Sequence, residues 1–220
     1  MPLATEKKGF SLKDLNEAIT KLKNESKKNF TQTFDLVIHI EGLDIKKEGG
    51  KLNKIIMLPN KPSKEKKVCV IGELTMAEKA KEGGADLILR KSDIEKLQGN
   101  KRELKKIARK YDFFLVQPDL MPLVGKLLGP YLGARGKLPE IVSPNVDVKS
   151  TISRLKQSVR IKVKNQPVIS CGIGTEDMPT EKLSENALTV INEVEKLIEG
   201  KGRIKSIYLK KTMSYPIKLR

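Results

Sequence analysis

The sequence predicts two domains: an α+β domain assembled from both ends of the chain, and an α/β domain inserted between them. Three observations carry this prediction. Apolar and polar residues alternate along segments near both ends, and short apolar runs alternate with helical segments in the middle. Neither end has enough strands and helices to build a core alone. A length of 220 residues is sufficient for two small domains.

The first third is expected to supply one helix and two strands. Apolar residues recur at helical spacing from Leu12 to Leu22, and Ser11 precedes them as an N-cap. Residues 33–40 place apolar side chains on one face of a strand, and residues 54–58 form a second strand.

The middle of the chain alternates strands and helices. Four strands are predicted, and helices separate them over residues 75–81, 101–110 and 119–128. The strands lie at residues 68–71, 86–89, 113–116 and 141–142. Runs that are apolar throughout are typical of parallel strands covered on both faces. This pattern predicts a Rossmann-like three-layer domain with a small parallel sheet.

The last third returns to the first pattern. Residues 159–164 alternate apolar and basic residues, a helix begins at Thr180, and a strand covers residues 204–209. Gly172 and Gly174 indicate a loop. Joined, the two ends give a four-stranded sheet with helices on one face. The predicted domains are therefore residues 1–62 with 157–220, and the insert 63–156.

Composition limits the function classes. A net charge of +17 points to a polyanion, with nucleic acid ahead of an acidic membrane surface. No apolar run approaches a membrane span and no signal peptide is evident, so a cytoplasmic location is expected. Cys69 and Cys171 are expected to be buried packing residues, and a lone histidine, His39, excludes sites that need two. Neither a metal nor a cofactor is expected.

The distribution of acids is more informative than the total charge. Segments 148–175 and 201–220 contain no Asp or Glu, and both lie mostly in the discontinuous domain. If their strands are neighbours, they form one basic surface. With only nine aromatic residues, a stacking platform for single strands is disfavoured. A folded RNA, recognised by its shape, phosphates and 2′-hydroxyls, is the expected partner.

An enzyme is not expected, but one alternative stays open. No Gly-x-Gly-x-x-Gly follows residues 68–71 and no phosphate-binding Gly-Lys-Ser/Thr occurs. The alternative is a nucleotide-using enzyme built on the α/β insert. A membrane-surface protein would need an amphipathic helix, and residues 101–110, although basic, have little apolar area.

Three segments resemble one known family. Ser-Ile-Tyr-Leu-Lys-Lys-Thr-Met at 206–213, Leu-Gly-Ala-Arg-Gly-Lys-Leu-Pro at 132–139 and Asn-Phe-Thr-Gln-Thr-Phe-Asp at 29–35 are similar to signatures of large-subunit ribosomal protein one, the lateral-stalk family. The sequences of these segments are most similar to those of archaeal members. Ala134, Leu138 and Ser214 depart from the usual Pro, Met and Gly of these signatures.

The resemblance implies a constituent of the large ribosomal subunit, monomeric off the ribosome. Its discontinuous domain would bind the stalk element of large-subunit ribosomal RNA and a similar structure in its own messenger RNA, repressing translation. It would also take part in releasing transfer RNA from the exit site. The RNA contacts implied by position are Phe30, Thr33, Ser206, Thr212, Met213 and Ser214. From their charge, Lys162, Lys164, Lys210 and Lys211 are expected to add phosphate contacts.

Overall fold

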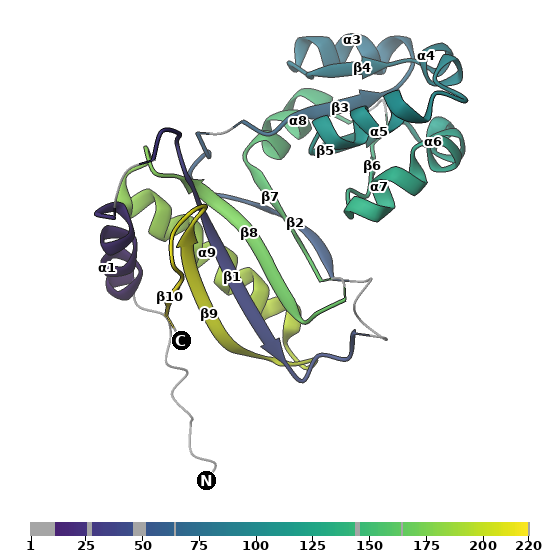
Figure 1. Cartoon of the computed structure of the whole chain (residues 1–220). Coiled ribbons are helices and arrows are strands. Elements are labelled where there is room, and N and C mark those ends of the chain that lie inside the picture. Colours follow the sequence, from purple (N-terminus) through teal and green to yellow (C-terminus); the bar gives the residue numbers. More distant parts are fainter. Residues whose placement is uncertain are drawn as a thin grey trace. The chain divides into compact units, whose positions relative to one another are not determined.

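The computed structural model describes residues 12–25, 28–45, 52–63, 65–143, 146–163 and 165–219. The chain divides into two compact units (Figure 1). Unit 1 comprises Met1–Lys64 with Val159–Arg220, and unit 2 comprises Glu65–Ser158. The predicted N-cap Ser11 lies outside the described residues.

Unit 1 is built on a four-stranded antiparallel sheet. Its strand order is β10 (Ile217–Lys218), β9 (Arg203–Lys211), β1 (Thr33–Glu41) and β8 (Val168–Thr175). The helices α1 (Leu12–Lys23) and α9 (Thr180–Ile198) pack together against one face, and α9 lies behind the sheet in Figure 1. The predicted α+β class is confirmed.

The membership of this sheet differs from the prediction. The segments expected as two of its strands, β2 (Asn53–Met57) and β7 (Ser158–Lys162), pair with each other in a separate two-stranded sheet. Their place is taken by β10 and by β8, which contains the predicted loop. The glycines of β8 serve close packing rather than a turn. A Cβ on Gly172 would lie 3.0 Å from the Thr33 side chain, and one on Gly174 would lie 2.5 Å from Leu183.

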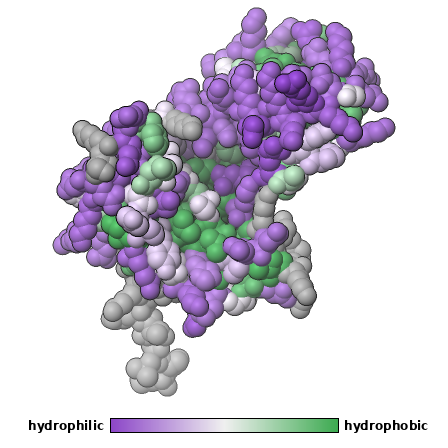
Figure 2. Space-filling model, viewed as in Figure 1, coloured by the Kyte–Doolittle hydropathy of each residue, from purple (hydrophilic) through white to green (hydrophobic). Residues whose placement is uncertain are grey.

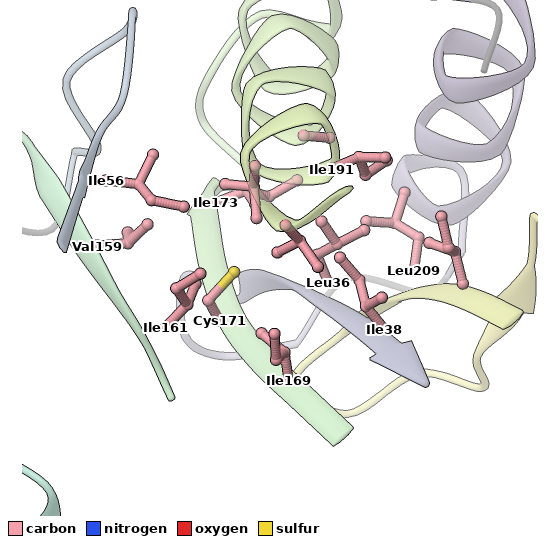
Figure 3. Packing of buried hydrophobic residues seen from close by; sticks show 14 of the residues in the cluster. Leu36, Ile38, Ile56, Val159, Ile161, Ile169, Cys171, Ile173, Ile191 and Leu209 are labelled. Atoms are coloured by element: carbon pink, nitrogen blue, oxygen red, sulfur yellow. The ribbon is translucent and has the colours of Figure 1, made fainter. Parts of the chain in front are cut away.

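Alternation along β1 directs its apolar side chains into the core. Phe34, Leu36, Ile38 and Ile40 are buried, and the residues between them are half-buried on the second face. Figure 3 shows Leu36 and Ile38 beside Cys171 of β8 and Ile191 of α9. Both cysteines are buried and neither is part of a disulfide, and burial raises the pKa of the Cys69 thiol.

Unit 2 is an α/β domain with a parallel sheet. Its strand order is β4 (Leu87–Leu89), β3 (Val68–Ile71), β5 (Phe113–Val116) and β6 (Glu140–Ile141). The core on one face joins alternate residues of β3 and β5 to α5 (Lys101–Lys110), α6 (Met121–Leu127) and α7 (Gly129–Arg135). On the opposite face α3 (Leu74–Glu82) packs against α8 (Val148–Lys156), and both helices contact β3. This arrangement confirms the predicted three-layer α/β domain.

The helices of unit 2 are more numerous than predicted. The helix expected over residues 119–128 is a 3₁₀ turn (Pro118–Leu120) followed by α6, and α7 continues after it. Neither α4 (Lys91–Lys96) nor α8 was predicted. Within the described ranges, none of the helices has the length and apolar character that a membrane crossing requires.

The segment 132–139 has a structural role at the end of α7. Gly136 ends this helix in the left-handed region, with φ of 65°. The next residue, Lys137, donates from Nζ to the carbonyl oxygens of Ala108, Arg109 and Tyr111 at distances of 3.2, 3.3 and 2.6 Å. These carbonyls end α5, so Lys137 caps a helix that lies far from it in sequence.

Candidate nucleic-acid interface

Three strand ends meet at one end of the unit 1 sheet. In the antiparallel register Thr33 lies opposite Thr175, and Phe34 lies opposite Lys211. The start of β1 therefore adjoins the last residues of β8 and β9. This register brings five of the expected RNA contacts into one region, although they are separated by up to 184 positions in sequence. We call these residues the strand-end cluster: Phe30, Thr33, Thr212, Met213 and Ser214.

Two threonines tie the cluster together. The Thr212 N–H donates to the Thr33 carbonyl at 3.0 Å, and the Thr33 N–H donates to the Thr212 Oγ1 at 3.2 Å. The Thr212 hydroxyl also donates to the Thr33 carbonyl at 3.4 Å. These bonds leave one lone pair of the Thr212 hydroxyl free to accept. The turn after β9 is therefore fixed to the start of β1.

A buried glutamine, which the sequence analysis missed, supports the same turn. Gln32 is 1% exposed, and its Oε1 accepts from the Met213 N–H at 3.1 Å. The Gln32 N–H donates to Glu176 Oε1, and its carbonyl accepts from the Glu176 N–H, both at 3.0 Å. Gln32 thereby joins all three strand ends. A bridge between residues 181 positions apart leaves no local pattern by which the sequence could reveal it.

Apolar side chains project from this frame into solvent. Phe30 is 49% exposed and Met213 is 66% exposed. Tyr215, which was not among the predicted contacts, is 87% exposed. Beside Phe30 is a cavity of about 480 Å³, whose lining includes Lys23, Lys28 and Glu176. The region thus combines apolar, cationic and hydroxyl groups on a fixed backbone.

Ser214 occupies the turn without strain. Its Oγ accepts from the Lys211 N–H at 2.7 Å, and its own N–H donates to the Lys211 carbonyl at 3.2 Å. Among the residues that the structure describes, only glycines have a positive φ, so Ser214 does not occupy the left-handed region. The serine in place of the family's usual glycine therefore fits this turn and adds a hydrogen bond to it.

The other expected contacts do not join the cluster. Ser206 lies opposite His39 in the β1–β9 register, six residues before Thr212, or about 20 Å along an extended strand. It is only 6% exposed, which corrects its expected role as an RNA contact. Lys210 lies opposite Asp35 on the same second face of the sheet and is half-buried. These two residues are positioned on the face of the sheet rather than at its end.

The basic residues are more dispersed than expected. Lys211 is 1% exposed, because its side chain points to the core face of β9; this corrects its expected role as an exposed phosphate contact. Lys162 is half-buried on β7, and Lys164 lies outside the described residues. Because β7 pairs with β2 and β9 pairs with β1 and β10, the two acid-free segments do not meet through β7 and β9. A single basic surface across these two strands is therefore not formed.

Comparison with known proteins identifies relatives over nearly the whole chain. The model of the Ribosomal protein L1p/L10e family matches residues 22–215. The chain is 42% identical to the large ribosomal subunit protein uL1 of Pyrobaculum arsenaticum, covering 90% of this chain and 89% of the relative. It is 44% identical to the protein of the same description from Thermofilum pendens, covering 93% and 92%, and 42% identical to that from Aeropyrum pernix, covering 94% and 95%. The chain belongs to the Ribosomal protein L1p/L10e family.

Proposed function

We propose that the protein is a non-enzymatic constituent of the large ribosomal subunit that binds ribosomal RNA through the strand-end cluster of unit 1. Its relatives are named as large ribosomal subunit proteins, which supports the ribosomal assignment. The observation that carries the site is the meeting of Thr33, Thr212 and Met213 on one hydrogen-bonded frame, with Phe30 two residues before Gln32 of that frame.

Each group in the cluster suits contact with a folded RNA. Among the described residues the Thr33 hydroxyl has no hydrogen-bond partner, so it is available to donate to a phosphate oxygen. The free lone pair of Thr212 suits a 2′-hydroxyl, which distinguishes RNA from DNA. The exposed Phe30 ring and Met213 thioether provide apolar area for a ribose or a base.

The second face of the sheet extends this interface. Ser206 and Lys210 lie four residues apart on β9 and therefore point to the same side as Asp35, Val37 and His39 of β1. Figure 2 shows that the face of unit 1 turned toward the viewer has a hydrophobic area bordered by hydrophilic side chains. We infer that RNA extends from the cluster onto this face, where the half-buried Lys210 contacts its backbone. Ser206 is only 6% exposed, so it supports this face from within rather than contacting RNA.

The same site would serve the finer roles that the family resemblance implies. A messenger RNA segment that folds like the ribosomal stalk element would compete for the strand-end cluster, so that binding represses translation of the protein's own message. Participation in the release of transfer RNA from the exit site would follow from the protein's place on the stalk. Both roles rest on the proposed RNA contact.

The alternative of a nucleotide-using enzyme is disfavoured by the groups at the carboxyl ends of β3 and β5. Parallel α/β sheets bind nucleotides at such a switch point, through free backbone N–H groups. Here the Glu73 N–H donates to Gln117 Oε1 at 3.0 Å, and the Glu73 carboxylate accepts from the Lys91 N–H at 3.0 Å. The Gln117 amide in turn donates to Asp119 at 3.1 Å. Two carboxylates at this position disfavour a phosphate.

The proposal is tested with a fragment of large-subunit ribosomal RNA that carries the stalk element. Met213→Ala removes exposed apolar area, and Thr212→Ala removes a hydroxyl, so each should weaken binding by about 1–3 kcal/mol. Met57→Ala is the matched control, because Met57 is also exposed, at 52%, but lies on β2. Equal affinities for the parent chain and both cluster variants would refute the assignment.

A further inference from the structure

Unit 2 has a strongly basic helix that the proposed function does not use. Six of the ten residues of α5 are Lys or Arg, and one, Glu103, is acidic. All six basic side chains are exposed, whereas Leu104 and Ala108 are buried in the core of unit 2. In Figure 2 the surface of unit 2 is predominantly hydrophilic. The solvent-facing half of α5 is therefore cationic.

The cations on α5 form two regular rows. Lys101, Lys105 and Arg109 make one row, and Arg102, Lys106 and Lys110 make the other. Residues four apart lie on the same side of a helix, with a rise of about 6 Å between them. Each row therefore presents three positive charges in line, and the pair of rows occupies about half of the circumference.

This arrangement does not stabilise the helix. Like charges four residues apart destabilise a helix by a few tenths of a kcal/mol per pair, and α5 contains four such pairs. Lys101 and Arg102 stand in the first turn, where the helix dipole disfavours positive charge, and Arg109 and Lys110 stand in the last turn, where it favours positive charge, so the dipole gives little net stabilisation. The ion pair of Glu103 with Lys106, at 3.6 Å, offsets only part of this repulsion. Local destabilisation of this kind is typical of functional sites.

The surroundings of α5 hold these charges in place. Asn100 caps its first turn by accepting from the Glu103 N–H at 3.2 Å, and Lys137 caps its last carbonyls. Leu104 and Ala108 anchor the helix to the sheet. The rows are thus presented on a fixed helix, which lowers the entropy lost when a partner binds.

The chemistry of the exposed half identifies the partner. Insertion into a membrane surface needs an apolar face, and of the three apolar residues of α5, Leu104 and Ala108 are buried and Ile107 is half-buried against the core of unit 2. The centre of a stable protein interface is enriched in Trp, Tyr and Arg and depleted in Lys, and the exposed half of α5 has no aromatic residue and four Lys against two Arg. Binding of a phosphate backbone, in contrast, requires only a row of cations. We propose that α5 is a second RNA-contacting surface, which binds the phosphate backbone of an RNA duplex without reading its sequence.

The first experiment measures which lysines a duplex protects. The full chain is mixed with a 16-base-pair RNA duplex of mixed sequence, acetylated with a lysine-reactive ester, and analysed by mass spectrometry. Protection of Lys101, Lys105 and Lys106 is expected, both in the parent chain and in Met213→Ala, because Met213 belongs to unit 1 and α5 to unit 2. Unchanged reactivity of these lysines would overturn the proposal. Equal protection by polyglutamate at the same charge concentration would also overturn it, because the surface would then not prefer phosphate.

The second experiment measures the salt dependence of duplex binding. One variant replaces Lys101, Lys105 and Arg109 with Gln, which preserves helix propensity. The matched control replaces three other exposed lysines with Gln: Lys81 on α3, Lys126 on α6 and Lys149 on α8. Both variants therefore lose the same net charge. Losing three phosphate contacts should reduce the slope of log K against log salt by about 2.7, and the control should reduce it by less than half of that. Equal slopes for the two variants would refute a specific role for α5, provided that circular dichroism shows both to be folded.

Discussion

Gln32 is predicted to position the RNA interface without contacting RNA. Its side-chain oxygen holds the Met213 N–H, and its backbone pairs with Glu176. Gln32→Met keeps the length and volume of the side chain but removes the acceptor. The Met213 N–H then loses its partner, which should cost about 1–3 kcal/mol of the free energy of unfolding.

The two possible effects of this variant can be separated by magnitude. Folded domains have stabilities of about 5–15 kcal/mol, so a loss of about 2 kcal/mol leaves a folded-to-unfolded ratio above about 100. Partial unfolding would therefore change the apparent Kd for RNA by only about 1%. A displaced Met213, in contrast, should weaken binding by about 1–2 kcal/mol, or roughly 5- to 30-fold in Kd.

The assay is fluorescence anisotropy with the stalk RNA fragment, alongside urea denaturation of the same samples. Gln98→Met is the control, because Gln98 is exposed on unit 2 and its side chain supports no strand end. The expected result is a raised Kd for Gln32→Met alone. A Kd within twofold of the parent value, together with a clear loss of stability, would show that Gln32 acts only in folding and would refute this reasoning.

Three further predictions concern unit 2. Lys137→Met should lower the stability of unit 2 by about 1–3 kcal/mol in urea denaturation, because three carbonyls at the end of α5 lose their charged donor; Lys126→Met, on an exposed lysine of α6, should have little effect. Gly136→Ala should cost about 1 kcal/mol, since φ of 65° disfavours a Cβ, and an unchanged denaturation midpoint would contradict this. The Ser150 N–H holds the pKa of Asp147 below its ordinary value, so this group stabilises the fold above about pH 4 and loses that contribution as pH falls through its folded-state pKa. Asp147→Asn should therefore be less stable than the parent at pH 6 and should approach it in stability at pH 3, and a constant difference would contradict the charge-based account.

The strands and helices with clean periodicity were predictable from sequence. The burial of β1 follows its alternation of residues, and β3 and β5 have the uniform apolar character of strands covered on both faces. Local preference and tertiary packing agree at these positions.

The errors in predicting unit 1 have a different physical origin. In β8, Gly172 and Gly174 suggested a loop, yet they are needed where Thr33 and Leu183 approach the strand closely. The register of β1 and β8 shifts between Phe34 and Asp35, which accommodates one extra residue on β8. Such crowding depends on residues far away in sequence, so sequence pattern alone assigned the glycines to a turn.

The candidate site was only partly predictable, because it combines a local motif with pairing between segments far apart in sequence. The resemblance selected Thr212 and Met213 by their motif, and the antiparallel register explains why they lie beside the start of β1. Charge alone could not distinguish Lys210 from Lys211, because neighbouring residues on a strand point to opposite faces. Lys211 is two residues after Leu209 and therefore points to the same face of β9, which is the core face. Its side chain is buried for this reason.

The strand-end cluster separates the groups that would contact RNA from the groups that fix their positions. Met213 is exposed, but its N–H is held by Gln32, and the preceding residue is bonded to Thr33. An apolar side chain on a fixed backbone loses less conformational entropy on binding than one on a free loop. Changes in the frame should therefore reduce RNA affinity even though they remove no contact, whereas changes in Met213 should reduce affinity with little effect on folding. This difference allows the two kinds of residue to be distinguished by measuring stability and affinity on the same variants.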